Sequence, residues 1–155
     1  MKRTVIVLTA ALGLVGAASG VASAHETDDW MRSPDAPGAY GYSYYGVASS
    51  HVGGVYQQVN AWKVGNYWAF DAFVEDTRTD GYCGTIQVAY TYGAQPSDHW
   101  HYRTVPVHDC STNGTGVSNG YFYSLDEFRN LRSRACHADT SGKIVECETN
   151  FHVIG

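Results

Sequence analysis

The chain predicts an all-β fold, either a sandwich or a flattened barrel of about seven or eight short antiparallel strands. Apolar and polar residues alternate through short segments, and turn residues separate these segments at regular intervals. No stretch sustains the period of a long helix. Two pairs of cysteines lie symmetrically about turn residues, which indicates two hairpins with a disulfide across each.

The first residues have the composition of a secretory leader. Lys2 and Arg3 form a basic start, Val5 to Val21 is apolar, and an Ala-Ser-Ala tripeptide ends at residue 24. We therefore expect residues 1–24 to be a signal peptide and the protein to be secreted. An uncleaved anchor is the alternative, but a cleavage pattern and a polar segment follow the apolar run. No later run approaches the roughly 20 apolar residues that cross a bilayer.

The charge of the chain is mildly acidic, with 15 Asp and Glu against 10 Lys and Arg. Such a chain has no electrostatic attraction for nucleic acid or for an anionic membrane surface. All four cysteines follow the leader, and disulfides persist outside the cell. Zinc is the competing use of these cysteines, but their spacings lack the short Cys-to-Cys knuckle of a zinc site.

Residues 25–39 are polar, contain two prolines and show no strict period. This pattern predicts a flexible N-terminal arm, followed by a single β-domain over residues 40–155. Tyr40, Tyr42 and Tyr44 then alternate with small residues, which favours an edge strand weakened by its glycines.

Two clear strand patterns follow, over residues 55–64 and 67–76, and the Gly65-Asn66 turn between them predicts a hairpin. In the first strand one face carries Val55, Gln57, Val59 and Ala61, and the other carries Tyr56, Gln58, Asn60, Trp62 and Val64. In the second strand the apolar face carries Trp68, Phe70, Ala72 and Val74, and the mixed face carries Tyr67, Asp71, Phe73 and Glu75.

The segment from Cys83 to Cys110 predicts the central hairpin. The two cysteines lie at equal distances from the bond between Pro96 and Ser97, so folding the chain back there brings them face to face. Pro96 suits a turn because its ring already fixes φ. The resulting register sets Ile86 opposite Val107 and Val88 opposite Val105. We expect the core face to carry Ile86, Val88, Tyr90, Tyr92, Val105 and Val107.

The strand that contains Pro106 is expected at a sheet edge or at a bulge, because proline cannot donate to a β-ladder. Beyond it, residues 111–120 form a loop in which Asn113 begins a glycosylation sequon. Ser124 to Glu127 fits a capping box, which favours one turn of helix before the next strand; a direct turn into that strand is the alternative.

A second hairpin is predicted at the C-terminal end of the chain. Cys136 and Cys147 are centred on Ser141-Gly142, and residues 143–153 alternate as a last strand. Hairpin symmetry therefore selects Cys83–Cys110 and Cys136–Cys147 from the three pairings that four cysteines allow.

The turn Asp76-Thr77-Arg78-Thr79-Asp80-Gly81-Tyr82-Cys83, and the later segment from Arg132 to Cys136 with Cys147 beyond it, carry a resemblance. Over about residues 65–150 the chain resembles a broad group of small secreted actinobacterial β-proteins. These share a D-T-x-x-D-G-x-C turn and a short Cys-to-Cys hairpin. The resemblance implies an exported β-domain, and it implies no activity.

Three groups of residues suggest metal sites. Cleavage after residue 24 would make His25 the N-terminus, where its amine and ring could chelate copper as in lytic polysaccharide monooxygenases. His99 and His101 would share a strand face, as two metal ligands do. Asp76 and Asp80 lie in an acidic turn that could hold Ca²⁺. Each has a simpler interpretation: a histidine that follows the cut, solvated loop histidines, and ordinary turn residues.

The abundance of aromatic residues suggests a binding surface. Twelve Tyr and four Trp exceed what a core of this size needs, so some must lie outside it. The predicted outer face of the central hairpin carries Thr91, Trp100, Tyr102 and Thr104, where planar side chains would stack on sugars or anchor a protein. The alternative is that another layer covers them.

We therefore expect a secreted, non-catalytic domain that binds a glycan, a cell wall or a cell-surface protein. No nucleophile motif or carboxylate pair stands out, which argues against an enzyme, and no cofactor is required. One competing hypothesis is a small metal-binding protein or enzyme that uses His25 or the pair His99 and His101. Another is an envelope-associated structural protein with no small ligand.

Overall fold

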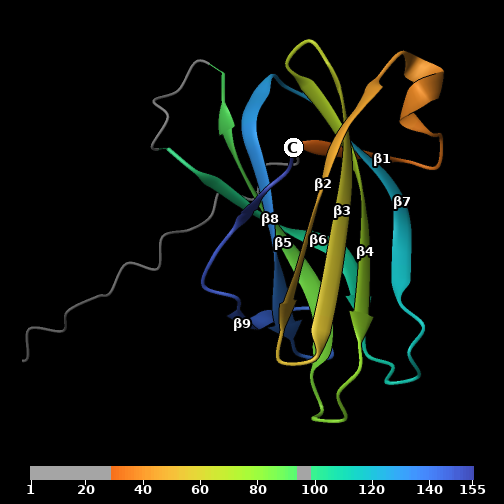
Figure 1. Ribbon diagram of the computed structural model, residues 1–155, viewed down its shortest axis with the longest axis vertical. Coiled ribbons are helices and arrows are strands. Elements are labelled where there is room, and N and C mark those ends of the chain that lie inside the picture. The colour runs from red at the N-terminus through yellow and green to blue at the C-terminus, as the bar shows by residue number, and fades with distance from the viewer. Residues whose placement is uncertain (1–28, 94–98) are drawn as a thin grey trace, which may run out of the picture.

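Two antiparallel sheets face each other in the computed structural model, which describes residues 29–93 and 99–155 (Figure 1). Sheet A has the order β1-β7-β4-β3-β2, and sheet B has the order β10-β8-β5-β6 with β9 paired to β8. The strands are β1 (Trp30–Ser33), β2 (Ser43–Val52), β3 (Val55–Val64), β4 (Tyr67–Asp76), β5 (Cys83–Tyr92), β6 (His101–Asp109), β7 (Val117–Ser124), β8 (Phe128–Ala138), β9 (Ile144–Cys147) and β10 (His152–Val153).

The predicted all-β sandwich is therefore confirmed. More strands are present than expected because β1, β9 and β10 are only four, four and two residues long. Helix in the described part of the chain is limited to the 3₁₀ turn η1 (Pro37–Tyr40). No helix there is long and apolar enough to cross a membrane.

Sheet A is built around the hairpins that join β2, β3 and β4. The β3 and β4 segments have the boundaries that the alternation predicts. Gly53 and Gly54 connect β2 to β3 with φ angles of 53° and 100°, the left-handed conformation that a two-residue hairpin turn needs. The tyrosine-rich segment contributes an edge strand as predicted, but β2 begins only at Ser43 and Tyr40 lies in η1.

The core lies between the two sheets and is rich in aromatic rings. Trp30 packs edge-on against Phe70 at 4.7 Å and against Tyr90 at 5.4 Å between ring centroids. Phe70 stacks on Phe122 at 5.1 Å. Such contacts add to the hydrophobic stabilisation of burial. The core faces predicted for β4 and β5 point into this core.

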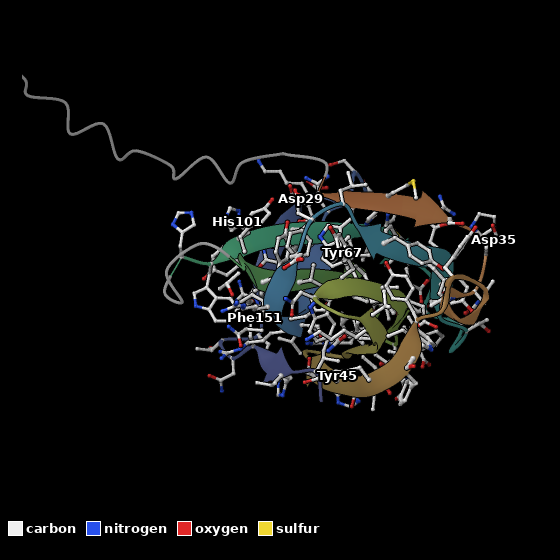
Figure 2. All side chains as sticks on the ribbon, turned by 90° about the horizontal axis from the view of Figure 1, so that it is seen from above. Asp29, Asp35, Tyr45, Tyr67, His101 and Phe151 are labelled. Atoms are coloured by element: carbon white, nitrogen blue, oxygen red, sulfur yellow. A yellow bond between two sulfur atoms is a disulfide. The ribbon has the colours of Figure 1, made fainter. Side chains whose placement is uncertain are left out.

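The prediction of a flexible arm over residues 25–39 is wrong from Trp30 onward, while residues 25–28 lie outside the described part. Trp30 opens β1, pairs with Ser124 of β7, and buries all but 9% of its surface in the core. The domain therefore begins well before residue 40. In Figure 2, Asp29 beside β1 and Tyr45 on β2 lie at opposite edges of sheet A.

The central hairpin has the predicted disulfide and only part of the predicted register. Cys83 and Cys110 are bonded. However, Val88 pairs with Arg103, where the symmetry of the hairpin predicts Val105. The pairs next to the disulfide, Gly84 with Asp109 and Thr85 with His108, keep the predicted register. The shift occurs beyond them, so the cysteines are opposed as predicted.

A bulge at Pro106 causes this shift. Thr85 pairs with His108, but the next pair joins Gln87 to Thr104, so β6 holds extra residues against β5. Pro106 lies among these extra residues, and β6 is an edge strand of sheet B. Both expectations for Pro106 are confirmed: its missing N–H is accommodated at an edge and at a bulge.

The helical turn predicted after Ser124 is absent, and the chain turns directly from β7 into β8. The Ser124 hydroxyl, expected to cap a helix, accepts a hydrogen bond from the backbone N–H of Trp68 at 2.9 Å. The N–H of Phe128 donates to the carbonyl oxygen of Asn66 at 2.9 Å. Because neighbouring strands already satisfy these groups, a helical turn would gain nothing from its cap.

The C-terminal hairpin pairs Cys136 with Cys147 in β8 and β9, as predicted, and the two are disulfide-bonded. The single last strand expected over residues 143–153 is instead two short strands, β9 and β10. Between them the Glu148 carbonyl oxygen accepts from Nη1 of Arg134 at 2.9 Å, which draws the chain over the outer face of sheet B.

Candidate functional site

The outer face of sheet A carries aromatic and amide side chains from four strands. Directly paired residues in antiparallel strands point to the same face, and the register pairs Gln58 with Phe73, and Asn60 with Asp71. The side chains on this face include Tyr44, His51, Tyr56, Gln58, Asn60, Trp62, Asp71, Phe73, Glu75, Ser118 and Tyr121. The valines and alanines between them in β3 point into the core.

Four of these residues form a hydrogen-bonded chain, which we call the polar ladder: Tyr56, Gln58, Asn60 and Asp71. The Tyr56 hydroxyl donates to Oε1 of Gln58 at 2.9 Å, and Nε2 of Gln58 donates to Oδ1 of Asn60 at 3.2 Å. Nδ2 of Asn60 donates to Oδ1 of Asp71 at 2.8 Å. Each amide is thereby held in one orientation, with its remaining N–H groups and lone pairs available to a ligand.

A groove runs over the polar ladder. It has a volume of about 430 Å³ and is open to solvent. Its lining consists of the four ladder residues with Phe73 and Ser118. Asp71 is the only charged residue in this lining, so the groove suits an uncharged polar ligand.

Aromatic rings flank the polar ladder at both ends. At one end Tyr56 lies 6.2 Å from Phe73 and 4.7 Å from the ring of His51. At the other end Trp62 lies 5.7 Å from Tyr44 and 5.7 Å from Tyr121. Tyr56 and Trp62 are six residues apart in β3, so the face extends about 20 Å along the strand.

The far margin of this face is closed by the 3₁₀ turn η1. Tyr123 lies on the outer side of β7, between Tyr40 and Tyr42 at 5.6 and 5.5 Å. Its hydroxyl donates to the backbone oxygen of Asp35 at 2.6 Å, and burial raises the pKa of Tyr123 to about 12. Tyr123 is therefore a protonated structural residue at neutral pH.

The surface predicted on sheet B is occupied largely by contacts within the protein. Trp100 is half-buried under the guanidinium of Arg132, 4.4 Å from its ring centre. Tyr102 keeps 43% of its surface exposed, but its ring lies 5.6 Å from Phe151. Thr91 is buried and donates to the backbone oxygen of Arg129. The prediction that Thr91 lies on the surface is therefore wrong.

Thr104 is exposed on the same side of sheet B, as predicted. Of the predicted surface residues, Thr104 and Tyr102 are the most accessible to solvent. They lie on the sheet opposite to the polar ladder, so they are no part of the groove.

The described residues that were proposed as metal ligands do not gather into one cluster. Within residues 29–93 and 99–155 no group of three or more His, Cys, Asp or Glu side chains is placed to hold a metal ion. His99 and His101 are neighbours, with ring centroids 4.9 Å apart. His25 lies outside the described residues.

Asp76 and Asp80 serve the turn in which they lie. Oδ1 of Asp76 accepts from the N–H of Arg78, and Oδ1 of Asp80 accepts from the N–H of Tyr82, at 2.9 and 3.0 Å. These are the local bonds that make aspartate common in turns, and they favour the simpler interpretation of this segment.

The sequence contains a signal for the groove that our prediction did not use. The outward positions of β3 read Tyr56, Gln58, Asn60 and Trp62, so two amides stand between two aromatic residues. This pattern offers hydrogen-bonding groups and aromatic rings side by side to a ligand. The pattern indicates a binding surface only if no other segment covers this face of β3. The alternation of residues along one strand does not show whether the face is covered.

Comparison of the chain with protein-family models, with curated proteins and with solved structures gives no match. The resemblance to small secreted β-proteins thus stays a prediction. The function of the chain has to be inferred from the geometry of its surface.

Proposed function

We propose that the protein is a non-catalytic, extracellular domain that binds a glycan on the outer face of sheet A. The observation that carries this proposal is the polar ladder, fixed by its own hydrogen bonds and flanked by aromatic rings. The two disulfides fit an extracellular protein.

The chemistry of the face matches the chemistry of a sugar. A sugar ring has an apolar face of C–H groups and an equator of hydroxyls. The C–H face would pack on the rings of Tyr56, Phe73 or Trp62. The hydroxyls would exchange hydrogen bonds with the amides of Gln58 and Asn60. Because the ladder already fixes these amides, little side-chain entropy is lost on binding.

Hydrolysis of the glycan is not part of the proposal. Glycosidases need two carboxyl groups on either side of the scissile bond, at most about 9.5 Å apart. Among the residues that line the groove, Asp71 is the one with a carboxyl group. The next acid on the same strand face, Glu75, is four residues away in β4 and does not line the groove. A single carboxyl group in the lining supports binding without cleavage.

The proposal is tested by titrating the purified protein with a panel of soluble polysaccharides and following tryptophan fluorescence. Trp62 lies in the proposed face and would report occupancy. We expect at least one polysaccharide to change the emission, and Tyr56→Ala and Asn60→Ala each to weaken its binding about tenfold, a loss of about 1.4 kcal/mol.

Tyr102→Ala is the matched control, because it removes an exposed tyrosine from the opposite sheet. Loss of binding in Tyr102→Ala with none in Tyr56→Ala would move the site to sheet B and contradict the proposal. Stoichiometric copper or zinc in the mature protein, with no polysaccharide bound, would favour the metal-binding hypothesis instead.

A further inference from the structure

The groove over the polar ladder has a neighbour at the β1 edge of sheet A. This second groove has a volume of about 480 Å³ and is lined by Arg32, Ser33, Pro34, Ser118, Asn119 and Gly120. Ser118 lines both grooves. Since β7 lies between β4 and β1, the second groove lies beyond the ladder groove, at the edge of the sheet. Arg32 pairs with the core residue Phe122, so its side chain leaves β1 on the inner side of sheet A, and a ligand has to pass round the β7 edge to reach it. Across the sheet, β1 lies three strand spacings from β3, about 14 Å.

The chemistry changes along this path from neutral to cationic. The ladder end offers amides, aromatic rings and the single carboxylate of Asp71, whereas the edge end offers the guanidinium of Arg32. Arg103 lines an adjoining cavity between the sheets together with Arg32, so this end of the groove is cationic. The two ends of a bound chain would therefore lie in different environments.

Arg32 is held in place by Asn119. Nε of Arg32 donates to the backbone oxygen of Asn119 at 2.7 Å, and Nη2 donates to its Oδ1. Nδ2 of Asn119 in turn donates to the backbone oxygen of Pro106 at 2.8 Å. The guanidinium is therefore preorganised through a side chain that is itself anchored to the other sheet.

The charge of Arg32 has no acidic partner within the part of the chain that the structure describes. The two hydrogen bonds to Asn119 use Nε and Nη2, so the N–H groups of Nη1 remain for a ligand. A guanidinium fixed in this way favours a carboxylate, with which it forms charge-assisted hydrogen bonds.

We infer that the bound glycan is an acidic one: a linear polysaccharide whose neutral sugars lie over the polar ladder and whose carboxylate-bearing sugar reaches Arg32. This inference rests on the proposed function, and it adds the substrate class. Arg32 sets specificity for the acid, while the ladder and its aromatic rings provide the binding common to neutral and acidic chains.

The test compares two matched pairs of oligosaccharides. One pair is cellohexaose and its form oxidised to uronic acids; the other is the β-linked N-acetylglucosamine hexamer and the same backbone with lactyl ethers on alternate sugars. Dissociation constants are measured by calorimetry at low and high salt. We expect the acidic member of at least one pair to bind about tenfold tighter at low salt, and salt to reduce this preference.

Arg32→Gln should lower the affinity for the acidic member to about that of its neutral counterpart, and should lower the affinity for the neutral member much less. Arg32→Lys keeps the charge without the fixed fork and should retain part of the preference. Arg129→Gln removes an exposed arginine from sheet B and is the charge-matched control, with no expected change.

The outcomes separate the two proposals. Equal binding of neutral and acidic members overturns the inference and leaves glycan binding intact. Equal losses for both members in Arg32→Gln, with a lowered melting temperature, mean that Arg32 has only a structural role, which also overturns the inference. If no member of either pair binds and the polysaccharide panel is negative as well, both proposals fail.

Discussion

Single side chains at the margin of the proposed face decide where a ligand can lie. Tyr40 and Tyr123 look alike in sequence but differ in role, since Tyr40 keeps 56% of its surface exposed and Tyr123 only 6%. The Tyr123 hydroxyl donates to the backbone oxygen of Asp35, so Tyr123 supports the segment that leads into the 3₁₀ turn. Exposed Tyr44 and half-buried Trp62 remain for stacking.

The raised pKa of Tyr123 predicts a loss of stability in alkali. Its pKa is about 12 in the folded protein against 10.0 for a free tyrosine, so the unfolded chain loses this proton first. The contribution of Tyr123 to stability is therefore complete below about pH 10 and is lost as the pH rises towards 12. We expect the free energy of unfolding to fall over this range, and to fall less steeply in Tyr123→Phe.

The measurement is urea unfolding of both proteins at about pH 8 and about pH 11. Tyr102→Phe, at an exposed tyrosine, serves as the control and should behave as the unchanged protein. An identical alkaline fall in Tyr123→Phe and in the unchanged protein would show that Tyr123 does not supply this contribution.

At the scale of the elements, the short strand β1 depends on one buried carboxylate beside it. Asp29 is 6% exposed, and its two oxygens accept hydrogen bonds from the hydroxyls of Tyr90 and Tyr92 in β5. Burial and the hydrogen bond from the Tyr90 hydroxyl to Asp29 raise the pKa of Tyr90. These bonds tie the start of sheet A to sheet B, so a strand of four residues can hold Trp30 in the core.

Asp29→Asn is therefore expected to destabilise the protein by about 2 kcal/mol, because a charged acceptor is replaced and a donor is left facing a hydroxyl donor. Urea unfolding of Asp29→Asn measures this loss, with Asp126→Asn at an exposed turn as the control. Equal stability of the two variants would contradict this prediction. It would mean that the hydrogen bonds of Asp29 to Tyr90 and Tyr92 do not stabilise the position of β1.

The sequence predicted correctly those elements that neighbouring residues along the chain determine. β3 and β4 follow from strict alternation around Gly65-Asn66, and both disulfides follow from hairpin symmetry. β1 could not be predicted, because its polar, proline-containing segment becomes a strand only through burial of Trp30 and pairing with β7. The helical turn at Ser124 failed for the same reason: a distant strand takes the hydroxyl that would cap it.

The sequence indicated that aromatic residues lie outside the core, but it did not indicate which sheet face stays open to solvent. The excess of aromatic residues correctly indicated rings outside the core, among them Tyr44 and Tyr102. Which face stays open is a tertiary property. The segment between β9 and β10 crosses sheet B, so that Phe151 reaches the rings and arginines there. Within residues 29–93 and 99–155, no later segment covers the polar ladder in the same way.

At the scale of the whole molecule, the two sheets have different outer faces. Sheet B covers its own with the pairs Trp100–Arg132 and Phe151–Arg134, whose cation-to-ring distances are 4.4 and 4.2 Å. Sheet A leaves its outer face open around the polar ladder. A buried bridge from Gln57 of sheet A to Ser133 of sheet B, 3.2 Å long, joins the layers.

The most direct test of this division is the set of indole N–H signals of the four tryptophans in an ¹H–¹⁵N NMR spectrum, recorded while a polysaccharide that binds is added. Trp62 lies on the open face, Trp30 and Trp68 are buried, and Trp100 lies on sheet B. We expect the Trp62 signal to shift with saturation and the Trp100 signal to stay in place. A shift of Trp100 without one of Trp62 would contradict the assignment of the binding face to sheet A.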